Sequence, residues 1–227
     1  MAVHTSLEEG IRLFKMKRWD KALEEFLRLD TAHFEPDDNV ELAYYLGLCY
    51  TKMERFNDAL LYLEQVVTSC NDPLRVYQCR LTLAYIYVIS DRSKLAEFEL
   101  SRLVKGGYES VQIYTTMAYA AWVQRLYQKA VDYYEKALEM DKDNTTALNG
   151  LGYILADSDI DVRRGISLCR KAVDKKPKSA AYLDSLGWAY YKNGNIAEAR
   201  SWLRRAFELA PNHKEIKKHI KLVVGKD

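Results

Sequence analysis

The sequence predicts an all-helical protein in which antiparallel helix pairs repeat along the chain and stack as a solenoid. Three observations lead to this fold class. A pattern of small and apolar residues occurs six times at nearly constant spacing. The 227 residues include only 4 prolines and 10 glycines beside 17 tyrosines, a composition that suits amphipathic helices better than a sheet. A short amphipathic segment follows the last repeat, and a repeat array needs such a helix to cover its exposed end.

The last repeat, residues 180–213, shows the pattern most clearly. It reads AAYLDSLGWAYYKNGNIAEARSWLRRAFELAPNH, which predicts a helix, a turn at Gly194-Asn195 and a second helix that Pro211 ends. Gly187 and Ala199 are small enough to let the two helix backbones approach closely. Larger side chains fill the seam around that contact: Leu186, Tyr190, Leu203, Phe207 and Leu209.

The same pattern recurs in five earlier segments, so that the repeats span residues 3–36, 40–73, 77–110, 111–144, 145–178 and 180–213. The small residue of the first helix is Gly10, Gly47, Ala84, Ala118, Gly152 or Gly187, and that of the second is Ala22, Ala59, Ala96, Ala130, Gly165 or Ala199. The fifth repeat carries one extra residue in its turn, between Asp157 and Arg163. Gly106-Gly107 predicts a helix stop and a joint between the first three repeats and the last three.

These positions resemble the tetratricopeptide repeat (TPR), whose pattern places Leu-Gly, Tyr, Ala, an aromatic or Leu, Ala and Pro at fixed offsets. The resemblance covers about residues 3–213. It implies a right-handed superhelical solenoid in which the first helix of each repeat lines a concave groove. In this family the groove is where a segment of another protein binds.

Aromatic residues occupy the positions that the resemblance assigns to the groove. They are Tyr44, Tyr85, Tyr119, Trp122, Tyr153, Trp188 and Tyr191, and the polar residues Asn149, Asp184 and Lys192 accompany them. Rigid aromatic side chains supply contact area at low entropic cost, and the polar groups would pair with a peptide backbone. The alternative is that several of the aromatic residues pack between neighbouring first helices as ordinary core.

The segment 214–227 is predicted to form a C-terminal capping helix and tail. Ile216, Ile220, Leu222 and Val223 are spaced for one apolar stripe, with lysines largely on the other face. We expect Asn212 to cap its start and Gly225 to end it. A basic helix that contacts nucleic acid or a membrane surface is the alternative interpretation.

No sequence motif indicates catalysis or a cofactor. The chain has no HExxH motif, no phosphate-binding glycine loop and no Gly-x-Ser-x-Gly turn. Asp157, Asp159 and Asp161 alternate as calcium ligands do, but the glycine and the closing glutamate of a calcium-binding loop are missing. We therefore expect no catalytic residue, no metal and no cofactor.

Cysteine usage and hydropathy bear on the compartment. Cys49, Cys70, Cys79 and Cys169 are scattered without a CxxC pair, which favours free thiols in a reducing compartment. The chain contains no apolar run of about 18 residues that would span a membrane. The residues MAVHTSLEEG do not form a signal segment, so the expected location is the cytoplasm.

The sequence thus predicts a non-enzymatic adaptor or scaffold that binds a partner protein in its concave groove. The bound segment would be an extended peptide or an amphipathic helix. One alternative is an assembly or export chaperone for a subunit of a larger machine, and another is a structural spacer or self-assembling subunit. A net charge of +2 is too small to argue for nucleic acid, which is not an expected partner.

Overall fold

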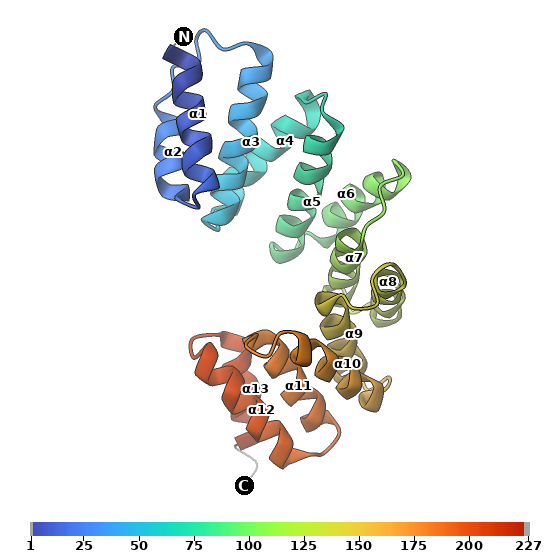
Figure 1. The fold of residues 1–227 in the computed structure, drawn as a ribbon. Helices are drawn as coiled ribbons and strands as arrows, with labels where there is room; N and C mark the ends of the chain where they lie inside the picture. Colours follow the sequence, from blue (N-terminus) through green and yellow to red (C-terminus); the bar gives the residue numbers. More distant parts are fainter. Residues whose placement is uncertain (1, 225–227) are drawn as a thin grey trace. The chain divides into compact units, whose positions relative to one another are not determined.

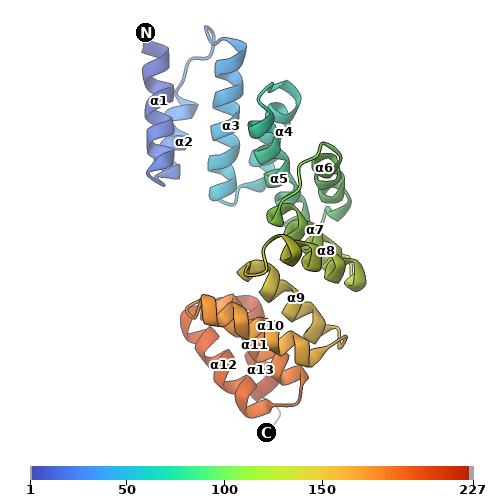
Figure 2. The ribbon, with the colours of Figure 1, turned by 45° about the vertical axis from the view of Figure 1, so that its right-hand side comes forward.

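The computed structural model describes residues 2–224, and the side chains of residues 7–223. Within that range the chain forms thirteen α-helices and no strand (Figures 1 and 2), which confirms the all-helical class. It divides into two compact units between Tyr108 and Glu109, directly after the predicted double-glycine joint. Gly107 has a φ of +82°, a left-handed conformation that glycine adopts without a steric penalty. None of the described helices combines the length and the apolar character needed to cross a membrane.

The first unit consists of three antiparallel helix pairs. Its helices are α1 (Ala2–Lys15), α2 (Trp19–Leu27), α3 (Pro36–Lys52), α4 (Phe56–Ser69), α5 (Pro73–Ile89) and α6 (Ser93–Lys105). Pro36 and Pro73 occupy the first helical position, where a missing backbone N–H leaves no hydrogen bond unmade. In Figure 2, α1 and α3 stand side by side, as expected for the first helices of consecutive pairs.

The second unit consists of three further pairs and one single helix. Its helices are α7 (Val111–Val123), α8 (Tyr127–Met140), α9 (Thr145–Asp157), α10 (Val162–Lys175), α11 (Ala180–Lys192), α12 (Ile196–Leu209) and α13 (Lys214–Val224). The first helix of each pair is capped, because the side chains of Ser110, Asn144 and Ser179 accept hydrogen bonds from backbone N–H groups at 3.3, 3.1 and 3.4 Å.

The two helices of a pair touch at the small residues that the pattern identified. A Cβ atom added at Gly152 on α9 would lie 2.7 Å from Cys169 Sγ and 2.9 Å from the carbonyl oxygen of Gly165, both on α10. One added at Gly187 would lie 2.7 Å from Leu203 Cγ. The equivalent alanines are fully buried: Ala22, Ala59, Ala84, Ala96, Ala118, Ala130 and Ala199. Side-chain size at these positions therefore determines how closely the helices pack.

The turn within each pair follows one backbone geometry. A residue with positive φ stands seven positions after the small residue of the first helix, at Lys17, Glu54, Asp91, Arg125, Asp159 and Gly194. The next N–H then closes the turn; for example, Asn195 donates to the Tyr190 carbonyl at 3.0 Å. In the fifth pair the Asp161 N–H donates to the Leu155 carbonyl at 3.2 Å. The acceptor there precedes the donor by six residues instead of five, which accommodates the predicted extra residue.

The helix α13 differs from its prediction at its start. It begins at Lys214, and the carbonyl of His213 accepts the first helical hydrogen bond from Lys217 at 3.1 Å. The residue in the N-cap position is therefore His213, and the assignment of Asn212 was one residue early. The predicted end at Gly225 lies outside the described residues.

The apolar stripe of α13 also needs a correction. Ile216 and Val223 are buried as predicted, with 1% and 0% of their surface exposed, but Leu222 is 43% exposed. Leu222 lies about 120° around the helix from Ile216, since each residue advances the helix by about 100°. It therefore falls outside the stripe that packs on α11 and α12.

All four cysteines are free thiols. Cys49, Cys79 and Cys169 are buried, whereas Cys70 is partly exposed. Burial raises the pKa of the Cys169 thiol to about 12, and it does the same for Cys49. Because the thiolate is the reactive form, buried cysteines of this kind are inert while the protein is folded.

Gly152→Ala should destabilise the second unit by roughly 1–3 kcal/mol, because the added methyl group meets backbone atoms of α10 that cannot move independently. Urea unfolding followed by circular dichroism would measure this effect. Ala197→Ser is the control, since Ala197 is exposed on α12 and should tolerate an added atom within about 0.5 kcal/mol. Equal midpoints for the two variants would contradict the close-contact argument.

At about pH 8 a thiol reagent should modify Cys70 first, because the raised pKa of the buried thiols leaves almost no thiolate there. Mass spectrometry of a labelling time course would identify the modified residue. Denaturant should make all four cysteines react at similar rates. Fast labelling of Cys169 in the folded protein would show that α9 and α10 are less tightly packed than described.

Candidate partner-binding site

The predicted groove residues of the first unit, Tyr44 and Tyr85, have different surroundings. The hydroxyl of Tyr44 on α3 donates to Gln78 Oε1 on α5 at 2.5 Å, and the Arg75 guanidinium lies 5.2 Å from the centre of its ring. Burial raises the pKa of Tyr44 to about 12. Tyr85 on α5 is 49% exposed. Tyr44 therefore joins two helices, whereas Tyr85 faces solvent.

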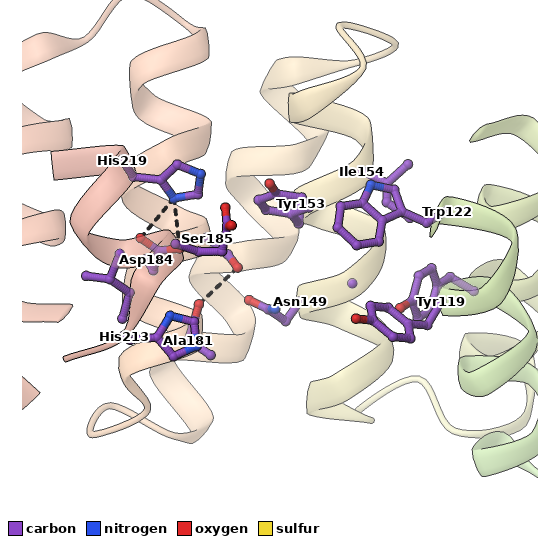
Figure 3. Close-up of a pocket in the computed structure, with 14 residues that line it drawn as sticks. Tyr119, Trp122, Asn149, Tyr153, Ile154, Ala181, Asp184, Ser185, His213 and His219 are labelled. Carbon is purple, nitrogen blue, oxygen red and sulfur yellow. Dashed lines mark hydrogen bonds and ion pairs between the residues drawn. The ribbon is translucent and has the colours of Figure 1, made fainter. Parts of the chain in front are cut away.

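Five of the predicted residues come together in the second unit, around one cavity of about 390 Å³. Tyr119 and Trp122 reach it from α7, Asn149 and Tyr153 from α9, and Asp184 from α11 (Figure 3). The helix α13 adds a wall that includes Glu215, Ile216 and His219. The cavity size is typical of small-ligand sites, and side chains from five helices line it. We call it the α7–α13 pocket.

Three aromatic rings form one wall of the α7–α13 pocket. Tyr119 stacks on Trp122 with ring centres 5.6 Å apart, and Trp122 meets Tyr153 edge to face at 5.8 Å. Tyr119 remains 38% exposed, so the wall continues to the protein surface. Each ring packs against its neighbour, which restricts the movement of all three.

Gly150 and Tyr134 complete the pocket. A side chain at position 150 would collide with the Tyr134 ring, which extends from α8 to the first helices. Burial raises the pKa of the Tyr134 hydroxyl, so this group stays protonated at neutral pH. Any side chain at position 150 would therefore have to displace the Tyr134 ring from its present place. The sequence pattern placed neither residue in the site.

Asn149 supplies an unsatisfied acceptor. Its Oδ1 atom is buried, and within the described part of the chain no donor reaches it. Leaving such an atom without a hydrogen bond costs on the order of 1–3 kcal/mol. Figure 3 shows the Asn149 side chain between the aromatic residues of α7 and the polar residues of α11. A ligand that donates a hydrogen bond there would remove this cost.

Asp184 lies opposite, in a buried pair with His219. Its two carboxylate oxygens are each 3.0 Å from His219 Nδ1, and the two residues are 7% and 3% exposed. The His219 ring stacks on Trp188 with centres 4.2 Å apart. Trp188 in turn donates from Nε1 to Asp157 at 2.8 Å. The pair therefore fixes α13 against the inner side of α11.

Three predicted residues do not line the α7–α13 pocket. Trp188 is covered by His219, and Tyr191 stacks on Trp188 with ring centres 5.1 Å apart. Lys192 donates from Nζ to Asp159 at 2.7 Å. Trp188 therefore packs against α13, while Tyr119 keeps an exposed side.

His219 is another pocket residue that sequence reasoning missed. It follows Asp184 by 35 residues, which is one repeat length. If α13 is aligned as the first helix of another repeat, His219 takes the repeat position directly after the one that Asp184 has in the sixth repeat, and the position of Asp184 is assigned to the groove. The signal was present, but the capping interpretation considered only the apolar stripe of this helix.

The charges near the pocket are negative. Burial raises the pKa of Tyr153, and the negative charges of Asp157, Asp184 and Glu215 raise it further. The described residues that line the pocket include the carboxylates of Asp184 and Glu215 and no lysine or arginine. The cavity thus combines aromatic faces, hydrogen-bond acceptors and negative potential.

The geometry does not form a hydrolytic triad. The hydroxyl of Ser185 donates to the Ala181 carbonyl at 2.9 Å within its own helix, while His219 Nδ1 faces Asp184. Across the described residues, no group of three or more His, Cys, Asp or Glu side chains is placed to hold a metal ion. The arrangement is one that can bind a molecule.

Comparison with known proteins identifies the repeat family. Models of the tetratricopeptide repeat match residues 41–70, 115–159 and 180–213. Among solved structures, a tetratricopeptide repeat protein from Parabacteroides merdae superposes with a TM-score of 0.77 at 13% identity, covering 98% of this chain and 84% of that one. YrrB, a TPR protein with an unusual peptide-binding site, superposes with a TM-score of 0.56 at 18% identity, covering 90% and 97%.

Two curated relatives are much longer than this chain. The TPR repeat-containing protein PA4667 of Pseudomonas aeruginosa is 40% identical over 80 residues, which are 35% of this chain and 13% of that protein. The human protein O-mannosyl-transferase TMTC1 is 23% identical over 224 residues, which are 96% of this chain and 24% of that protein. The likeness therefore concerns a minor part of each relative.

His219→Leu should weaken the attachment of α13, because the buried Asp184 carboxylate loses its partner and Trp188 loses its stacked ring. We expect a loss of roughly 1–3 kcal/mol in unfolding free energy and a shift of tryptophan emission toward longer wavelength. His33→Leu is the matched control, since His33 is exposed and lies in the first unit. If both variants behave alike, the buried pair does not stabilise this end of the fold.

Proposed function

Because this chain belongs to the tetratricopeptide-repeat family, we propose that it is a non-enzymatic scaffold that holds a segment of a partner protein in the α7–α13 pocket. The family supports a protein-interaction role in general, and the lining of the pocket supports this site for it. The observation that carries the proposal is the convergence of Tyr119, Trp122 and Tyr153 beside the unsatisfied Asn149. Aromatic anchors that pack against one another are typical of binding hot spots.

The bound segment would be extended or a short amphipathic helix, with one large side chain in the cavity. The volume of about 390 Å³ accommodates a side chain together with part of its backbone. YrrB is described as a TPR protein with an unusual peptide-binding site, and peptide binding on the same fold supports this mode of use. We propose the cytoplasm as the compartment, since the four free thiols are stable where reducing conditions prevail.

A non-enzymatic role is part of the proposal. TMTC1 is named a transferase, but this chain matches only 24% of its length at 23% identity, so that activity is not transferred. The buried polar residues of the pocket are used to attach α13 and to hold their own helices. Binding without chemistry is the function that these contacts support best.

Tyr119→Ala should weaken capture of partner proteins from the source cell's lysate about tenfold or more, because it removes the exposed end of the aromatic wall. Quantitative mass spectrometry of the bound proteins would measure this loss. The change is preferable to one at Trp188, whose removal would also disturb α13.

Tyr85→Ala is the matched control, because Tyr85 has the same repeat position and is also exposed but lies in the first unit. It should retain the partners that Tyr119→Ala loses. If both variants keep the same set of proteins, or if the chain captures only its own copies, binding occurs on another surface and the scaffold proposal for this pocket is wrong.

A further inference from the structure

The chemistry of the α7–α13 pocket indicates which side chain it accepts, an inference that rests on the proposed function. Several polar groups of the pocket are hydrogen-bond acceptors, so they favour a ligand that donates hydrogen bonds. Asn149 Oδ1 lacks a hydrogen bond, and the carboxylates of Asp184 and Glu215 add acceptor oxygens. An ionised carboxylate accepts about four hydrogen bonds, so Asp184 retains capacity beyond its contact with His219.

The aromatic wall favours a cation among the possible donors. The faces of Trp122, Tyr119 and Tyr153 carry the negative part of the ring quadrupole, which attracts a cation placed over them. The carboxylates of Asp157, Asp184 and Glu215 reinforce that potential: burial is the main cause of the raised pKa of the Tyr153 hydroxyl, and these charges raise it further. The described lining residues include no lysine or arginine, and the nearby His219 ring contacts Asp184 rather than Glu215.

In the first unit, a similar set of groups already binds an arginine of the same chain. The Arg75 guanidinium lies 5.2 Å from the centre of the Tyr44 ring. Its nitrogens are 3.4 Å from Glu41 Oε1 and 3.9 Å from Asp72 Oδ2. One aromatic ring and two carboxylates thus hold an arginine between α3 and α5. The α7–α13 pocket offers a comparable set of groups, and the described lining includes no arginine.

We propose that the α7–α13 pocket binds an arginine side chain of the partner segment. The planar guanidinium packs on the aromatic wall and donates to Asn149 Oδ1 and to the carboxylates of Asp184 and Glu215. Arginine fits better than lysine because its planar group stacks on rings and presents five donors in a fixed arrangement. Lysine carries a compact, strongly hydrated charge that would lose more hydration on entering the cavity.

The test uses the full chain, labelled with ¹⁵N, and N-acetyl-arginine methylamide as the probe. The indole N–H signal of Trp122, assigned with Trp122→Phe, should shift in a saturable manner as the probe is added. The citrulline derivative has the same shape without the charge and should bind at least about tenfold more weakly. The lysine derivative should fall between them. Trp19 and Trp202 lie outside the pocket and serve as internal controls.

Two variants test the assigned contacts. Asn149→Leu removes the acceptor at similar size, and Glu215→Gln removes a charge from an exposed residue at the pocket rim. Each should weaken arginine binding roughly five- to tenfold or more. Glu198→Gln is the charge control, because Glu198 is exposed on α12 and does not line the pocket. Glu215→Gln should also reduce the salt dependence of binding.

Several outcomes would overturn the inference. They are no Trp122 shift up to the solubility limit of the probe, equal binding of arginine and citrulline, and unchanged binding in both pocket variants. If Tyr119→Ala still abolishes partner capture in that case, the pocket binds its partner through another side chain and only the arginine assignment fails. If partner capture is also unaffected, the proposed function fails with it.

Discussion

The close contact between the two helices of each pair is the constraint on which the rest of the structure depends. At Gly152 and Gly165 the backbones of α9 and α10 meet with no side chain between them. Buried alanines at the equivalent positions allow the other pairs to pack nearly as closely. Once that distance is set, each first helix presents one face to its pair partner and another to the neighbouring first helices. The inner faces of α7, α9 and α11 then come together around one cavity.

The helix α13 has two structural roles. Ile216 and Val223 cover the apolar face that the last pair would otherwise expose. Next to them on the buried face, His219 pairs with Asp184 and stacks on Trp188, while Glu215 stands at the rim of the pocket. The cap therefore also forms one wall of the candidate site. Stability of the C-terminal end and the shape of the pocket are linked through these few contacts.

The two units use similar residue types in different ways. In the first, Tyr44 and its neighbouring carboxylates hold Arg75 of the same chain, so this aromatic position is occupied. In the second, Tyr153 and Trp122 border a cavity with an unsatisfied acceptor. A repeated backbone thus supplies comparable positions, and the side chains at each one decide between internal packing and an open site. For this reason the repeat fold does not by itself specify the ligand.

The sequence alone determined the repeat period, the helix pairs, the small residues at their contacts and the candidate aromatic positions, because each depends on spacing within about 40 residues. It located only one of the six left-handed turn residues, since only Gly194 is a glycine while Lys17 and Arg125 adopt the same conformation. Tertiary structure decided which aromatic residues share a cavity. It also revealed the roles of Gly150, Tyr134 and His219, whose contacts join residues on different helices. Such contacts depend on how helices pack and on side-chain direction, and a one-dimensional pattern records neither.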